Sequence, residues 1–168
     1  PKIHNKLSNE IISVGLGHRR LSILDLSVAG HQPMASDSDN WIVYNGEIYN
    51  FFEIRDELIE IGYQFVSNTD TEVILAAFKE WGISCQNRFT GMFSFALFNR
   101  ENQIMYLSRD RYGIKPLYYW VSPDSTLYFA SEIKQFTVLP GWRSILNHQR
   151  ASDYLFFQGL TDHTEETL

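Results

Sequence analysis

The chain has 168 residues, enough for one domain that buries about two-thirds of the surface its unfolded chain exposes. Its hydrophobic content of 44% is typical of a globular protein, and no run approaches the roughly 18 apolar residues of a membrane-spanning helix. The net charge is −6 and there is no basic cluster, which argues against nucleic acid and anionic membranes as partners.

Cysteine and histidine are sparse. Cys85 is the single cysteine, so an internal disulfide is excluded, and no charged-then-apolar leader opens the sequence. Both observations favour the cytoplasm. Pro1 is an improbable translation start, so we expect the natural chain to begin upstream. The histidines are scattered without ligand spacing, and no metal site is expected.

The first organised stretch is IISVGLGHRRLSILD, residues 11–25. Apolar residues alternate there with a two-residue period, which predicts a strand, and Gly15 and Gly17 would mark a bulge or a close approach of another backbone. His18 and Arg20 share one face of this strand. The basic run has two interpretations: an edge strand that uses charge to discourage pairing, or an inward arginine that grips a carboxylate with its bidentate fork.

Residues 26–40 are predicted to form a loop, and WIVY at 41–44 a strand that Asn45-Gly46 interrupts. One interpretation is a two-residue hairpin turn, since both residues tolerate positive φ. The other is that Gly46 lacks a side chain so that its N–H can face a ligand, with the Asn45 amide as a second donor beside it. Such a pair of donors makes an oxyanion hole.

Two amphipathic helices are predicted next. Asn50 is a plausible cap for the first helix, whose apolar residues recur at Ile54, Leu58 and Ile61 before Gly62 ends it. This helix is expected to cover a sheet.

Residues 63–66 are predicted to be a short strand, and Thr69 then caps a second helix with Glu72 as its partner in the first turn. Gly82 ends this helix. Asp70 lies in the first turn, where the helix dipole stabilises a carboxylate. Helix stabilisation alone would account for an acidic residue there, so the residues by themselves leave a binding role for Asp70 open.

From residue 91 onward, short apolar segments alternate with tight turns. We predict strands at 92–98, 104–108, 117–121 and 127–130. The strand at 92–98 is apolar on both faces and must be covered on both. The layout is α+β, an antiparallel meander with two inserted helices. Beyond it, only 151–157 suggests a turn or two of helix.

Seven motifs agree, in order and spacing, with one known family: GHRRLSILDLS (17–27), GHQPM (30–34), NGEIYN (45–50), SNTDTEVIL (67–75), GMFSFALF (91–98), SRDRYGIKPLYY (108–119) and LYFASEIK (127–134). They resemble the glutaminase domain of glutamine-dependent asparagine synthetase, a class II glutamine amidotransferase of the N-terminal-nucleophile hydrolase fold. The resemblance runs over residues 14–136. It implies an αββα sandwich of two antiparallel sheets flanked by helices, with this domain over 1–140, its first strand absent, and a tail or linker start over 141–168.

The resemblance also implies roles for single residues. Arg20 would bind the α-carboxylate of L-glutamine and Asp70 its α-ammonium group, while Asn45 and Gly46 would form the oxyanion hole. A zwitterion suits one fixed cation and one fixed anion, and an oxyanion suits two donors. The rest of the substrate pocket would come from Leu21, Ser22, Ile23, Leu24 and Glu47. No cofactor is implied for this domain; ATP and Mg²⁺ would belong to an absent synthetase domain.

The nucleophile is where the sequence departs from the family. The family uses a cysteine at the mature N-terminus, whereas Pro1 stands first here, and Cys85 has neither the position nor a basic neighbour to activate it. Cys85 is predicted to be a structural or surface thiol, and the chain by itself is expected to be inactive.

Two functions remain open from the sequence. One is the glutaminase half of an enzyme that hydrolyses L-glutamine and supplies ammonia to ATP-activated aspartate, or to a related carboxylate, in a partner synthetase domain. The other is a binding or structural relative without a nucleophile. The set of Arg20, Asn45, Gly46 and Asp70 favours the first. Homodimerisation stays open.

Overall fold

The structure, a computed structural model, describes residues 12–20, 27–36 and 39–157. The chain divides into two compact units, Pro1–Leu117 and Tyr118–Leu168. The expected division near residue 140 stays a prediction.

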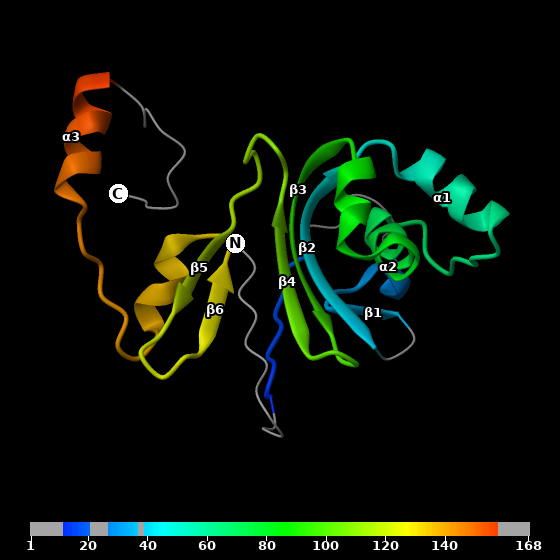
Figure 1. Cartoon of the computed structure of the whole chain (residues 1–168), viewed down its shortest axis with the longest axis horizontal. Coiled ribbons are helices and arrows are strands. Elements are labelled where there is room, and N and C mark those ends of the chain that lie inside the picture. The colour runs from blue at the N-terminus through cyan, green and yellow to red at the C-terminus, as the bar shows by residue number, and fades with distance from the viewer. Residues whose placement is uncertain (1–11, 21–26, 37–38, 158–168) are drawn as a thin grey trace. The chain divides into compact units, whose positions relative to one another are not determined.

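A four-stranded antiparallel sheet in the order β1-β2-β3-β4 is the centre of the first unit (Figure 1). Its strands are β1 Met34–Ser36, β2 Asn40–Ile48, β3 Gly91–Asn99 and β4 Ile104–Arg109. The β2 and β3 strands pair over their whole length, whereas β1 pairs only with the first three residues of β2. Among the described residues, no strand covers this edge over the rest of β2.

Two helices follow β2 and lie on one face of this sheet (Figure 1): α1 at Phe51–Glu60 and α2 at Asp70–Trp81. Alternate sheet residues face them, so that Ile42, Tyr44, Phe95 and Leu97 form one buried cluster with apolar side chains of both helices. The helix residues in that cluster include Ile54, Leu58, Ile74, Ala77 and Phe78. The 3-10 helix η2, Gly82–Arg88, continues from α2.

The predicted cap of α2 is confirmed, and it holds the start of this helix in place. The Thr69 hydroxyl accepts a hydrogen bond from the Glu72 backbone N–H at 3.3 Å. The Glu72 carboxylate reaches back to the N–H groups of Val66 and Ser67, at 2.9 and 2.7 Å. Because Glu72 binds these two N–H groups, they are not available for pairing with another strand. Residues 63–66 do not form the predicted strand.

Asn50 is the N-cap residue of α1, as predicted, but it does not cap the helix through its side chain. The Asn50 side chain makes no cap hydrogen bond; it donates instead to Arg88 O at 3.0 Å and accepts from Thr90 N at 2.8 Å. Ile61 lies beyond the helix and is exposed, whereas Ile54 and Leu58 are buried as expected.

The segment 11–25 differs from the predicted strand, because residues 12–20 form no strand. Residues 11 and 21–25 lie outside the described residues.

The interpretation of Asn45-Gly46 as a hairpin turn is wrong, because β2 runs straight through both residues. Gly46 lies opposite Phe93 in β3 at a φ of +156°. A Cβ on Gly46 would lie 2.3 Å from Met92 O, and one on Gly91 would lie 2.1 Å from Glu47 O. Glycine is required here because the two backbones approach each other closely.

The second unit contains a two-stranded antiparallel sheet, β5 at Tyr118–Val121 and β6 at Leu127–Ala130. Trp120 and Tyr128 stack across it with ring centroids 5.4 Å apart. The 3-10 helix η3, Ile133–Val138, and α3, His148–Phe157, follow. The α3 helix begins three residues before the predicted helical segment. In the part of the chain that the structure describes, no helix could cross a membrane.

Candidate functional site

The uncovered edge of β2 carries a row of backbone donors, and side chains bind two of them. Tyr44 N donates to Gln32 Oε1 at 2.7 Å, and Ile48 N donates to Asp70 Oδ2 at 3.1 Å. Because alternate residues of a strand direct their N–H groups to the same side, the Gly46 N–H lies on this edge between them. No acceptor for it is found within 12–20, 27–36 or 39–157.

Asn45 supplies a second donor next to that N–H group. It lies opposite Ser94 of β3, so its side chain projects from the sheet face turned away from α1 and α2. Asn45, Gly46 and Glu47 are half-buried, in contrast to the buried residues Tyr44 and Ile48 on either side. An oxyanion hole needs two donors that converge on one point, and Asn45 and Gly46 are the adjacent, partly accessible candidates for it.

Asp70 places a buried carboxylate at the same edge. It is 5% exposed, and its Oδ2 accepts from the Tyr44 hydroxyl at 2.6 Å as well as from Ile48 N. Burial raises the pKa of Asp70, and the hydrogen bonds from Tyr44 and Ile48 oppose that rise because they favour the ionised form. Its place in the first turn of α2 favours the same form.

Gln32 and Tyr44 belong to this site although no sequence motif assigned either of them a role. Gln32 accepts from Tyr44 N and donates from Nε2 to Thr71 Oγ1 at 3.4 Å, so one side chain joins β2 to the first turn of α2. Gln32 lies in the GHQPM motif, so its membership in a family motif was the sequence signal that could have identified it. Tyr44 gave none beyond an inward position in a strand.

The Arg20 guanidinium group lies against Gly30 of the 3-10 helix η1, Val28–Gly30. A Cβ on Gly30 would lie 2.6 Å from Nη2 and 2.7 Å from Nη1 of Arg20, so the absent side chain leaves the space that the guanidinium occupies. Burial lowers the pKa of His18, the nearby backbone of Tyr44 opposes this, and the charge of Arg20 lowers the pKa further. Arg20 thus lies in the same region as the β2 edge. Leu21, Ser22, Ile23 and Leu24 lie outside the described residues.

Cys85 is not placed for catalysis. It is fully buried in η2 among the apolar side chains beneath the sheet. Burial raises its pKa to about 12, so the group remains a thiol at neutral pH. Cys85 is therefore a structural thiol rather than a surface thiol, the two roles that the sequence left open.

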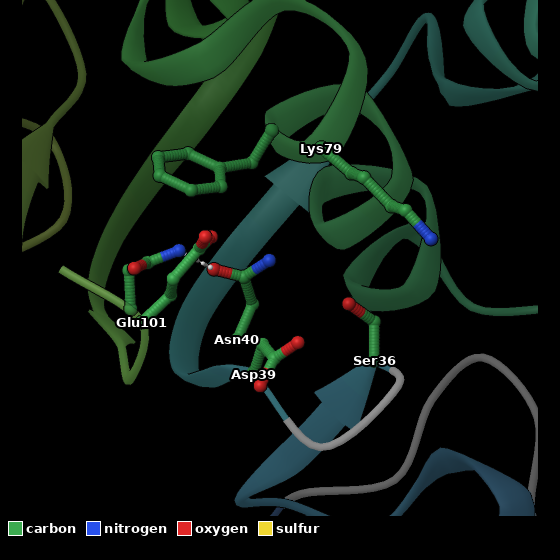
Figure 2. A pocket seen from close by; sticks show the side chains of 7 residues that line it. Ser36, Asp39, Asn40, Lys79 and Glu101 are labelled. Carbon is green, nitrogen blue, oxygen red and sulfur yellow. Dashed lines mark hydrogen bonds between the residues drawn. The ribbon is translucent and has the colours of Figure 1, made fainter.

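A hollow of about 220 Å³ lies at the opposite end of β2 (Figure 2). Asn40 and Asn99 lie side by side in its wall, with Asn99 Nδ2 donating to Asn40 Oδ1 at 2.8 Å. Lys79 and Glu101 also line it, and Figure 2 shows both side chains at its margin. The predicted site residues do not line this hollow. Among the residues that can be described, no group of three or more His, Cys, Asp or Glu side chains could hold a metal ion.

Residues 4–167 match the family described as the glutamine amidotransferase domain. The chain belongs to this family. Its relatives confirm the resemblance read from the motifs. The domain is 41% identical over 145 residues to asparagine synthetase [glutamine-hydrolyzing] 1 of Bacillus subtilis, covering 86% of this chain and 23% of that protein. It is 41% identical over 159 residues to amidase chyE of Penicillium rubens, covering 90% of this chain and 23% of that protein. The chain thus spans about a quarter of the length of these relatives.

Solved structures show the fold of this amidotransferase domain. A glutamine phosphoribosylpyrophosphate amidotransferase from B. subtilis superimposes with a TM-score of 0.54 at 23% identity, over 64% of this chain and 26% of that one. The structure titled as the allosteric regulatory enzyme of purine biosynthesis gives 0.56 at 21% identity, over 68% and 27%. The expected α+β fold with antiparallel sheets and helices is confirmed.

Proposed function

We propose that this glutamine amidotransferase domain is the glutaminase half of a glutamine-dependent asparagine synthetase. One observation carries the proposal. The N–H of Gly46, for which the described residues provide no acceptor, lies on the edge of β2 between two N–H groups bound by side chains, and the buried carboxylate of Asp70 holds one of those groups. This arrangement supports the proposal, because the hydrolysis of an α-amino acid amide needs a donor for the oxyanion and an anion for the ammonium group.

Each site residue has a role in this proposal. Arg20 binds the α-carboxylate of L-glutamine through its guanidinium fork, and Asp70 binds the α-ammonium group. The side-chain amide carbonyl then lies at Asn45 and Gly46, whose donors stabilise the negative charge that develops on its oxygen. Leu21, Ser22, Ile23, Leu24 and Glu47 complete the substrate pocket.

The buried Cys85 cannot attack a substrate at this edge. We therefore expect the 168 residues to bind L-glutamine without hydrolysing it at an enzymatic rate. In the whole protein, ammonia from glutamine would amidate aspartate activated by ATP and Mg²⁺ in a synthetase domain, and the cytoplasm is the expected compartment. This domain itself needs no cofactor in the proposal.

The match to amidase chyE supports a second candidate. Its identity to this chain, 41%, equals that of the B. subtilis synthetase. In this alternative the same glutamine site serves a whole protein with an amidase activity, and the acceptor of the ammonia is not aspartate.

Steady-state kinetics of the full-length protein test the proposal. Arg20→Ala should raise KM for glutamine far more than it lowers kcat, because a carboxylate clamp acts alike on the ground state and the transition state. Asn45→Ala should do the reverse and lower kcat by about 10²–10³-fold, the usual effect of one lost oxyanion donor. Arg19→Ala, on the exposed neighbour of Arg20, is the matched control and should change neither constant.

Each outcome decides between named alternatives. Effects of both variants on KM alone would remove Asn45 from the oxyanion role. Ammonia release from glutamine without asparagine formation would favour the amidase candidate. No release of ammonia by the full-length protein would leave a non-catalytic relative.

A further inference from the structure

We propose that Tyr44 is a positioning residue that makes this site selective for α-amino acids. Its hydroxyl group fixes the Asp70 carboxylate toward the α-ammonium group of the substrate. This inference rests on the proposed function, because it assigns Asp70 to the ammonium group of glutamine.

The contact between the two side chains is short and almost completely buried. Tyr44 is 4% exposed and Asp70 is 5% exposed, and 2.6 Å separate Tyr44 Oη from Asp70 Oδ2. Ile48 N donates to the same oxygen at 3.1 Å. Both donors from β2 thus hold the same oxygen of the carboxylate, Oδ2.

Tyr44 is itself held from several sides, so its hydroxyl group has a fixed position. Gln32 accepts from its backbone N–H at 2.7 Å and is tied in turn to Thr71 in α2. The ring of Tyr44 lies in the buried cluster beneath the sheet. A buried polar group with all its partners in place is rigid.

The hydroxyl group also determines the charge of Asp70. Burial raises the pKa of Asp70, and the Tyr44 hydrogen bond is the largest of the interactions that oppose this rise. Removing the hydroxyl must therefore raise the pKa further. A protonated Asp70 cannot form an ion pair with an ammonium group.

The groups around the pair do not replace this interaction. Burial and the charge of Asp70 raise the pKa of Tyr44, and Glu47 of the same strand acts in that direction too, so Tyr44 stays a proton donor at neutral pH. His18, from the segment before β1, has a lowered pKa and is neutral there. Gln32, which accepts from Tyr44 N, and Thr71, which accepts from Gln32, carry no charge.

Binding of two ligands as a function of pH tests this inference. The probes are L-glutamine and glutaramic acid, which is glutamine without its α-amino group, titrated calorimetrically into the chain from mildly acidic to mildly alkaline pH. Tyr44→Phe keeps the ring and removes the hydroxyl. It should raise Kd for L-glutamine roughly tenfold, as the loss of one hydrogen bond to a charged group does, and move the acid limit of binding to higher pH. Binding of glutaramic acid should not change.

Two further variants separate this role from a structural one. Tyr106→Phe removes a hydroxyl from another tyrosine on the same sheet face, which contacts Phe78 rather than Asp70, and should bind both ligands like the wild type. In an Asp70→Asn background, adding Tyr44→Phe should have almost no further effect on Kd, since Tyr44 acts through the carboxylate.

The possible results exclude one another. Equal weakening of both ligands by Tyr44→Phe, or an unchanged pH profile for L-glutamine, would overturn the positioning role. A wild-type chain that binds neither ligand would instead refute the proposed function, and this inference with it.

Discussion

Replacing Gly46 by alanine tests why a glycine stands in the middle of β2. Its Cβ would lie 2.3 Å from Met92 O and 2.6 Å from the Phe93 Cα, and both of these are backbone atoms that a side-chain rotation cannot move away. The residue also has a φ of +156°, which L side chains rarely adopt.

The two effects set the expected size of the loss. Overpacking typically costs about 1–3 kcal/mol, and a sparsely populated backbone conformation costs about 1–3 kcal/mol more. The free energy of unfolding should therefore fall by about 2–6 kcal/mol, a large part of the roughly 5–15 kcal/mol that a domain has. Urea unfolding followed by circular dichroism measures it. Gly15→Ala is the matched control, since nothing lies within 4 Å of its Cβ position.

An unfolding midpoint of Gly46→Ala equal to that of the wild type would refute this reasoning. It would mean that β2 and β3 do not approach as closely as the geometry indicates, and that access of a ligand to the N–H is the sole reason for glycine. A destabilised variant that still binds L-glutamine would show the converse, that the strand contact alone demands it.

Two other predictions concern Gly30 and Asp110. Gly30→Ala should displace the guanidinium of Arg20, which is the flexible end of a side chain. KM for glutamine in the full-length protein should therefore rise, with little change in the unfolding midpoint. A large loss of stability with an unchanged KM would contradict this prediction. Burial alone would raise the pKa of Asp110, but backbone N–H donors from Lys115, Ile114, Phe93 and Tyr112 together lower it. Because the folded pKa is lowered, the stabilisation is present above the unfolded pKa of an aspartate and is lost as pH falls through the folded value. The Asp110→Asn variant should therefore be less stable than the wild type at neutral pH and should lose less stability on acidification. Parallel curves of unfolding midpoint against pH for the two proteins would exclude this.

Elements fixed by short-range contacts could be predicted from the sequence. The α2 helix follows from its apolar period and from Thr69, whose hydroxyl caps a residue three positions away. Failures occur where a distant group competes for the same atoms. Asn50 has the residue type of a cap, but residues of the segment that leads into β3 take both ends of its amide. Asn45-Gly46 has the composition of a turn, but pairing with β3 keeps it extended.

The candidate site divides in the same way. The motifs indicated Gly46 and Asp70, and the structure brings both to one edge of β2. They could not indicate that Tyr44 and Gln32 hold this edge, because an inward tyrosine in a strand is normally a core residue and a glutamine in a loop is normally solvated. What distinguishes both residues is a partner in α2, and no local pattern contains it.

The anchoring of Asp70 has a consequence for the order in which the domain acquires its structure. Tyr44 and Asp70 are 26 residues apart, and Gln32 and Thr71 are 39 apart. The α2 helix can form its own cap early, but loops of this size close only as β2 meets the helix, and contacts that are distant in sequence form slowly. The fixed carboxylate therefore belongs to the completed fold and not to any segment of it. A ligand that needs it binds the folded chain alone and by mass action shifts the equilibrium away from partly folded forms.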